Sequence, residues 1–179
     1  MIVVSNTSPL TNLAAIGQFD LLQQQYEKVH IADGVWMELN FGGRPWPGSE
    51  EVAQAGWIER HTVRNQELVT ALRRDLDRGE AETIALALQL ESDLVLIDEQ
   101  QGRHTAARHG LRTLGVVGIL LEAKAAGQIE LIRPQLDSLR HQAGFFLSEN
   151  FYQEALILAE EISNKTAEGH GARNEKTRE

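Results

Sequence analysis

Hydrophobic residues along the chain alternate between short continuous runs and helical spacing. Short aliphatic runs at 2–4, 29–32 and 94–97 predict strands. The run at 94–97 is apolar throughout, as expected of a strand that is covered on both faces. Between these runs, apolar residues recur at the intervals of amphipathic helices. Short strands that alternate with helices predict a three-layer α/β domain, in which helices flank a mainly parallel sheet of four to five strands.

Capping residues and chain breakers indicate where these elements begin and end. Ser8 followed by Pro9 has the pattern of a helix N-cap and the first helical residue. Glycines and prolines are concentrated in 41–49, which predicts a loop. We expect one domain over residues 1–162. The polar segment 163–179 has no core pattern, and we expect it to be disordered.

Composition narrows the classes of protein that fit this pattern. The chain has 179 residues, 42% hydrophobic and 24% charged, which is the globular range. It contains no cysteine, which excludes disulfides, thiolate metal sites and cysteine nucleophiles. No apolar run approaches the roughly 20 residues of a membrane span, and the N-terminal sequence lacks the pattern of a signal peptide. We therefore expect a cytoplasmic protein.

The net charge of −9 argues against non-specific binding of nucleic acid, which needs clustered Lys and Arg. It does not exclude a nuclease. A cluster of acids that binds divalent cations makes its surroundings negative until the metal is bound.

Polar residues directly after predicted strands are the first candidates for a site, because ligands of parallel sheets bind beyond the carboxyl ends of the strands. Asn6 follows the first strand and Asp98 follows the run at 94–97. Glu38 and Glu80 lie on predicted helices and could reach the same edge. Each residue also has a structural interpretation. Asn6 could be a turn residue, Glu38 a solvated helix residue, and Asp98 the cap of the helix that follows it.

Two glutamates, Glu80 and Glu82, lie on the helix that begins near Asp77, and either is a candidate for the site. Glu82 and Gln89 are seven residues apart and predict a solvent-facing polar stripe, whereas Glu80 shares its side with apolar residues. A carboxylate on an apolar side needs a partner. The spacing of Asp77 and Glu80 also fits a capping box, so a capping role and a metal or catalytic role for Glu80 both stay open.

Other chemical signals are weaker. The six histidines show neither the H-x-x-x-H nor the H-E-x-x-H spacing, so the sequence does not predict a zinc site. Arg103 lies shortly after Asp98 and could bind a phosphate backbone, although a solvated helix face explains it equally well. Trp46, within the glycine–proline loop, is a candidate for an exposed contact.

Four motifs follow one another in a recognisable order: S-N-T-S-P-L, I-A-D-G-V-W-M-E-L, L-D-R-G-E-A-E-T-I-A-L-A-L and L-V-L-I-D-E. Together they resemble the PIN domain superfamily, which includes the VapC-type toxins. The chain is most similar to a prokaryotic branch of PIN-like proteins that opens with N-T-S-P-L. The likeness covers residues 1–162.

The resemblance implies acids that bind Mg²⁺ or Mn²⁺ at the carboxyl edge of the sheet. Carried over by position, the metal-binding and catalytic residues are Asn6, Glu38, Glu80 and Asp98, and Glu99 is a further candidate. Thr7 and Arg103 are expected to bind substrate. At Asn6 the sequence departs from the aspartate that is common in the family, and an amide oxygen can coordinate a metal without supplying negative charge.

The implied function is a metal-dependent endoribonuclease acting on an RNA substrate, as the toxin of a toxin–antitoxin pair. An antitoxin protein and a homodimer are the expected partners. Because Asn6 removes one charge, the alternative is a weakly active or inactive PIN-like module that binds RNA or a protein. A phosphatase of the haloacid dehalogenase type is disfavoured, because that chemistry needs an aspartate nucleophile at the position of Asn6.

Overall fold

A five-stranded sheet organises the computed structural model, which describes residues 1–41 and 46–163. All strand pairs are parallel, and the strand order is β3-β2-β1-β4-β5. The strands are β1 (Val3–Ser5), β2 (Val29–Ala32), β3 (Ile58–His61), β4 (Leu94–Leu96) and β5 (Thr113–Leu114). The prediction of a mainly parallel sheet of four to five strands is confirmed.

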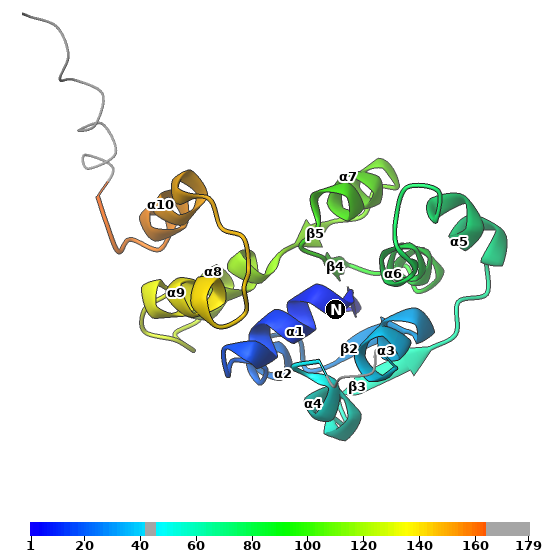
Figure 1. The fold of residues 1–179 in the computed structure, drawn as a ribbon, viewed down its shortest axis with the longest axis horizontal. Coiled ribbons are helices and arrows are strands. Elements are labelled where there is room, and N and C mark those ends of the chain that lie inside the picture. Colours follow the sequence, from blue (N-terminus) through cyan, green and yellow to red (C-terminus); the bar gives the residue numbers. More distant parts are fainter. Residues whose placement is uncertain (42–45, 164–179) are drawn as a thin grey trace, which may run out of the picture.

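Helices connect the strands and follow the last one (Figure 1). They are α1 (Thr7–Ala15), α2 (Leu21–Tyr26), α3 (Asp33–Asn40), α4 (Ser49–Gln54), α5 (Gln66–Leu72), α6 (Arg78–Gln89), α7 (Gln100–Arg108), α8 (Val116–Ala125), α9 (Arg133–His141) and α10 (Glu149–Leu158). No helix in the described part of the chain is both long and apolar enough to cross a membrane.

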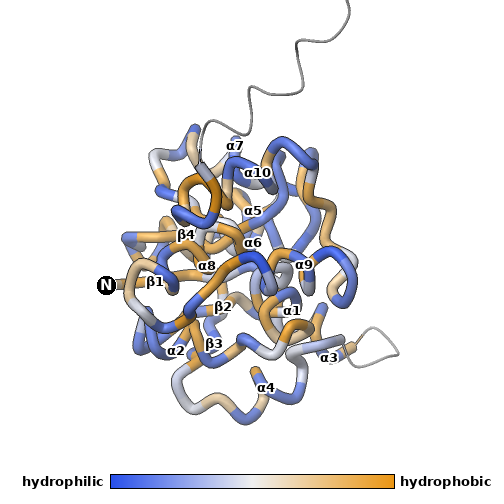
Figure 2. Tube along the Cα trace, turned by 90° about the vertical axis from the view of Figure 1, so that its left-hand side faces the viewer, coloured by the Kyte–Doolittle hydropathy of each residue, from blue (hydrophilic) through white to orange (hydrophobic). Residues whose placement is uncertain are grey.

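The sheet separates two hydrophobic clusters. Successive side chains of a strand point to opposite faces, so Val3 packs in one cluster and Val4 in the other. The first cluster joins the sheet to α1, α2, α8, α9 and α10, and the second joins it to α5, α6 and α7. Figure 2 shows hydrophobic residues along β1 and β4 in the interior. The predicted three-layer arrangement, a sheet with helices on both faces, is therefore confirmed.

The start of α1 differs from the prediction. The helix begins at Thr7 with Asn6 as its N-cap residue, so Ser8 is not the cap. The reason is that β1 ends at Ser5, and Asn6 is still extended, with φ −77° and ψ 174°. Ser8 instead directs its hydroxyl toward Asp98.

Other expectations concern segments between and after these elements. The predicted loop at 41–49 is replaced at its end by α4, which begins at Ser49 and which no clear sequence pattern predicts. Residues 42–45 of that loop lie outside the described residues. The tail predicted to be disordered lies outside them from residue 164 onward.

Candidate functional site

The strand order places a site between β1 and β4. From β1 the chain continues to β2 on one side, whereas β4 lies on the other side of β1. In open parallel sheets, a ligand crevice forms at such a switch point, beyond the carboxyl ends of the strands. Asn6 follows β1, and Asp98 comes two residues after the end of β4. The backbone N–H of Asn6 donates to the carbonyl of Leu96 at 2.9 Å, which fixes the two strand ends against each other.

Asn6 is buried, with 2% of its surface exposed. Its Nδ2 donates to Oε2 of Glu99 at 3.3 Å. Its Oδ1 is buried and has no hydrogen-bond partner among the described residues. A buried polar oxygen without a partner is costly, and this oxygen is a donor atom of the kind that binds a hard cation.

Glu38 is held by two other segments. Its Oε2 accepts from the hydroxyl of Thr7, and its Oε1 accepts from the backbone N–H of Gly79 at 2.8 Å. A Cβ atom at residue 79 would lie 2.5 Å from both carboxylate oxygens, so this approach requires glycine. Burial raises the pKa of Glu38, and the nearby Asp77 adds to this effect. The interpretation of Glu38 as a freely solvated residue is therefore wrong.

Glu80 combines the two roles that the sequence left open. The predicted capping box is confirmed: its backbone N–H donates to Oδ1 of Asp77 at 2.8 Å, and its Oε2 accepts from the N–H of Asp77 at 3.1 Å. Its Oε1 is buried without a hydrogen-bond partner among the described residues. Burial raises the pKa of Glu80, and together with the negative charges of Asp77, Glu99 and Glu38 it brings this pKa to about 7. The capping box therefore uses Oε2 of Glu80 and leaves Oε1 available to bind a ligand.

The prediction that Glu82 faces solvent is wrong. Only 5% of this residue is exposed. Its Oε2 accepts from the N–H of Gly34 at 2.6 Å, and its Oε1 accepts from Nε of Arg78 at 2.6 Å. Because α3 packs against α6, the outer side of α6 is covered, and Glu82 binds an otherwise unpaired donor in the first turn of α3. Glu82 therefore has a structural role, and its charge is paired with the guanidinium of Arg78.

Asp98 binds to two helices rather than capping α7, whose N-cap residue is Glu99. Its Oδ1 accepts from the N–H of Val116 at 2.6 Å, at the start of α8. Its Oδ2 accepts from Ser8 at 2.9 Å and from Asn12 at 3.1 Å. Burial raises the pKa of Asp98, although these hydrogen bonds oppose the rise. Each carboxylate oxygen has a second lone pair, so coordination of a cation stays open to Asp98.

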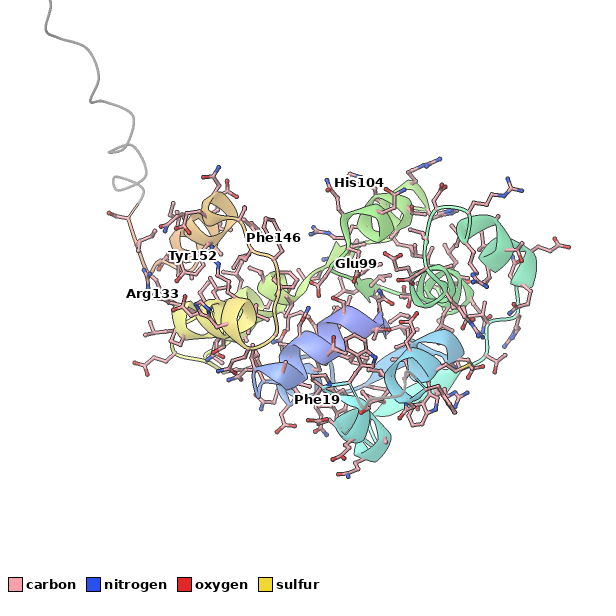
Figure 3. The ribbon with its side chains drawn as sticks, in the orientation of Figure 1. Phe19, Glu99, His104, Arg133, Phe146 and Tyr152 are labelled. Carbon is pink, nitrogen blue, oxygen red and sulfur yellow. The ribbon has the colours of Figure 1, made fainter. Side chains whose placement is uncertain are left out.

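Two clefts open beside these residues. One has a volume of about 640 Å³ and is lined by Asn6, Thr7, Glu38, Asp77 and Glu99, with the exposed Phe41 and Trp46 also on its wall. The other has a volume of about 890 Å³ and is lined by Asp98, Arg103, His104, Phe146 and Phe151, among others. Figure 3 shows Glu99, His104 and Phe146 around the space between α7 and the segment before α10.

The acid cluster consists of Asn6, Glu38, Asp77, Glu80, Asp98 and Glu99, and Arg78 lies on the wall of the cleft beside it. No ion pair in the described part of the chain involves its five carboxylates. Burial raises the pKa values of Glu38 and Glu80, and the like charges of the cluster raise both further. Carboxylate and amide oxygens are the ligands that Mg²⁺ and Mn²⁺ prefer. The residues present therefore fit a divalent cation.

Several residues that shape the cluster were missed at the level of sequence. Ser8 and Asn12 both bind Asp98, and their four-residue spacing places them on one face of α1. Gly79 admits Glu38, and Gly102 lies so close to Oε1 of Glu80 that a Cβ atom there would be 2.8 Å away. The spacing of Ser8 and Asn12 is a signal that could have been used. The need for the two glycines is visible only in three dimensions.

A comparison with protein-family models gives one finding. A model described as a PIN domain matches residues 2–161. The comparison with curated proteins gives no match.

Proposed function

Because the chain belongs to the PIN domain family, which has a nuclease-like fold, we propose that it is a Mg²⁺- or Mn²⁺-dependent endoribonuclease. The observation that carries this proposal is a pair of buried oxygens without hydrogen-bond partners among the described residues, Oδ1 of Asn6 and Oε1 of Glu80. They lie within a group of carboxylates that forms no ion pair in the same part of the chain. A divalent cation supplies the positive charge that such a group needs.

The chain's own residues would divide the work as follows. Asn6, Glu38, Glu80 and Asp98 would hold the metal, with Glu99 beside them. When bound, the metal supplies a hydroxide ion from water and stabilises charge on a phosphoryl oxygen. Thr7 fixes the carboxylate of Glu38.

Ser8 and Asn12 fix the carboxylate of Asp98 through their hydrogen bonds. These contacts hold the carboxylates in place before any ligand arrives, which reduces the reorganisation needed for catalysis.

RNA is the proposed substrate. Thr7 lines one cleft and Arg103 the other, where each can contact a phosphate group. Exposed aromatic side chains at both clefts, Trp46 and Phe146, offer ring faces on which unpaired bases stack. An antitoxin partner and homodimer formation are implied by the resemblance alone and stay predictions. The cytoplasmic location also stays a prediction.

The test compares two glutamates on one helix. Glu80→Gln removes the charge of the cluster, whereas Glu82→Gln is the matched control, since Glu82 is equally buried but pairs with Arg78. Purified proteins are incubated with structured RNAs and Mn²⁺. We expect cleavage by Glu80→Gln to fall by at least about 100-fold, the usual scale for loss of a group that acts on the transition state, and cleavage by Glu82→Gln to persist.

Asp98→Asn gives a second measurement at the opposite side of the cluster, with an amide that can still accept from Val116. Equal cleavage by wild type, Glu80→Gln and Asp98→Asn would refute the proposed mechanism. Absence of cleavage at every metal concentration, with RNA binding intact in all variants, would favour the alternative of a binding module, for which the neutral Asn6 is the supporting observation.

A further inference from the structure

A second cluster of ligand-bearing side chains lies within the sheet itself, on strands β2 and β3. The strands pair in register, with His30 opposite Glu59 and Ala32 opposite His61. Because side chains alternate along a strand, His30, Glu59 and His61 all point to the same face. We refer to these three residues as the histidine cluster. In Figure 1, β2 and β3 lie in the lower part of the molecule, whereas α7 lies at the top.

The three side chains converge on one point. One ring nitrogen of each histidine and one oxygen of Glu59 all lie within 4.8 Å of one another. Nδ1 of His30 is 2.9 Å from Nε2 of His61, and in the metal-free protein one of these nitrogens donates a hydrogen bond to the other. Oε2 of Glu59 is 3.5 Å from the first of these nitrogens and 3.8 Å from the second.

The two distances to Glu59 suit a shared metal ion better than they suit hydrogen bonds from the histidine rings to Glu59. Two ligands at about 2.0–2.1 Å from a tetrahedral metal are about 3.3 Å apart, and the three observed distances lie on both sides of this value. A strong hydrogen bond from a histidine to a carboxylate would be shorter, at about 2.7–2.9 Å. Lys28 pairs with the other oxygen of Glu59, Oε1, at 2.6 Å, which leaves Oε2 directed at the two rings.

We propose that His30, Glu59 and His61 form a binding site for a transition-metal ion of the zinc class. Two imidazoles and one carboxylate are a ligand set typical of Zn²⁺ and are unlike the all-oxygen sets of Mg²⁺. In a neutral imidazole the proton can sit on either nitrogen, so both facing nitrogens can be free to bind. Water or an external ligand takes the fourth position, on the side where Glu59 is 43% exposed.

The site would fasten the edge of the sheet. β3 is the outermost strand and pairs only with β2 among the described strands. An ion bound by His30 on β2 and by Glu59 and His61 on β3 links the two strands through their side chains. A ligand that binds only the folded protein stabilises it. This proposal is independent of the proposed nuclease function.

The experiment is a Zn²⁺ titration of the metal-free full-length protein against a chromophoric chelator, with Co²⁺ absorption as a report of ligand geometry. The variants are His61→Ala, Glu59→Gln and Glu80→Gln, with His109→Ala as a matched control at an exposed histidine outside the cluster. Glu80→Gln weakens the acid cluster, so Zn²⁺ whose affinity is unchanged in this variant but reduced in His61→Ala is bound at the histidine cluster.

We expect the wild type, Glu80→Gln and His109→Ala to share one Zn²⁺ equivalent of the same affinity, with a tetrahedral Co²⁺ spectrum and a raised melting temperature. In His61→Ala the affinity should fall more than about 100-fold, because loss of a ligand exceeds the 10–100-fold cost of losing a second-shell partner. Wild type that binds no Zn²⁺ at micromolar concentration, or His61→Ala that binds as tightly as wild type, would overturn the proposal. If His61→Ala fails to fold, unchanged affinity in the exposed variant Glu59→Gln overturns it equally.

Discussion

The acid cluster and the histidine cluster are built from the same sheet in opposite ways. In the acid cluster, the Asn6 amide after β1, carboxylates after β4 and carboxylates of α3 and α6 surround a crevice. Separate hydrogen bonds from Thr7, Gly79 and Ser8 hold the carboxylates. In the histidine cluster, three side chains of two neighbouring strands converge within 4.8 Å. The acid cluster consists of residues that lie at strand ends and helix starts along one edge of the sheet. The histidine cluster depends on the register between β2 and β3.

The difference shows what each kind of site needs from the fold. A crevice at a strand end requires only that strands run parallel, so its members can be expected from their positions after strands and at helix starts. A cluster in the middle of two strands requires one particular register, because a shift by one residue moves every side chain to the other face. The histidine cluster therefore depends on the pairing of β2 with β3, whereas the acid cluster depends on strand ends and helix starts that meet at one edge of the sheet.

The largest effect should come from Gly79→Ala, which acts on the acid cluster alone. A Cβ atom would lie 2.5 Å from both oxygens of Glu38 and would displace this carboxylate. We expect RNA cleavage to fall by about 100-fold, the scale reported for a displacement of about 1 Å in an active site. Stability should change by less than about 1 kcal/mol, because alanine favours the helix and the displaced group is the end of a flexible side chain.

Cleavage assays and urea unfolding measure the two effects, and Zn²⁺ binding should be unchanged. Gly56→Ala is the control, because a Cβ atom there meets nothing within 4 Å. Cleavage by Gly79→Ala at the wild-type rate would show that the position of Glu38 does not matter.

A smaller effect is expected from Asn6→Asp, which restores a carboxylate at the buried end of β1. The added charge should tighten Mn²⁺ binding by about tenfold, since a unit charge near a bound cation contributes a few kcal/mol at most in a partly solvated site. The same change removes the donor to Glu99 and should destabilise the metal-free protein. Calorimetry with Mn²⁺ provides the measurement. Equal Mn²⁺ affinity in the two proteins would place residue 6 outside the metal site.

The smallest effect concerns the stability of the metal-free protein. The contributions of Glu80 and His30 to this stability change in opposite directions with pH. Burial raises the pKa of Glu80 to about 7, so between its unfolded value near 4.5 and pH 7 the folded state binds more protons. Stability contributed by this group falls as the pH rises. Burial lowers the pKa of His30, and the neighbouring His61 lowers it further, so stability contributed by His30 rises with pH.

Urea unfolding in EDTA separates these contributions. The stability of Glu80→Gln relative to wild type should increase by about 1 kcal/mol between pH 5.5 and 6.5, close to the value for one proton per pH unit. The stability of His30→Gln relative to wild type should decrease over the same range. A pH-independent difference for Glu80→Gln would mean that Glu80 keeps an ordinary pKa in the folded protein.

Much of the fold could be predicted because local patterns agree with the tertiary structure. The strand at 29–32 and the start of α6 after Asp77 are found where hydrophobic runs and the capping box place them. The six-residue helix α4 was missed, because it has little room for a periodic pattern. The burial of Glu82 was also missed, since its polar side faces α3 instead of solvent, and only the packing of two helices decides this.

The sequence by itself determined the order of strands and helices and the positions of the acids after them. These follow from short-range periodicity and capping, which act within a few residues. The spacing of Asp77 and Glu80 indicated a capping box, which the structure contains, but it left a second role of Glu80 open. Only the tertiary structure decided that the second oxygen of Glu80 and Oδ1 of Asn6 are buried without partners. It also decided that His30 and His61, 31 residues apart, meet across two strands. Burial and register are set by packing between segments distant in the chain, which no local pattern encodes.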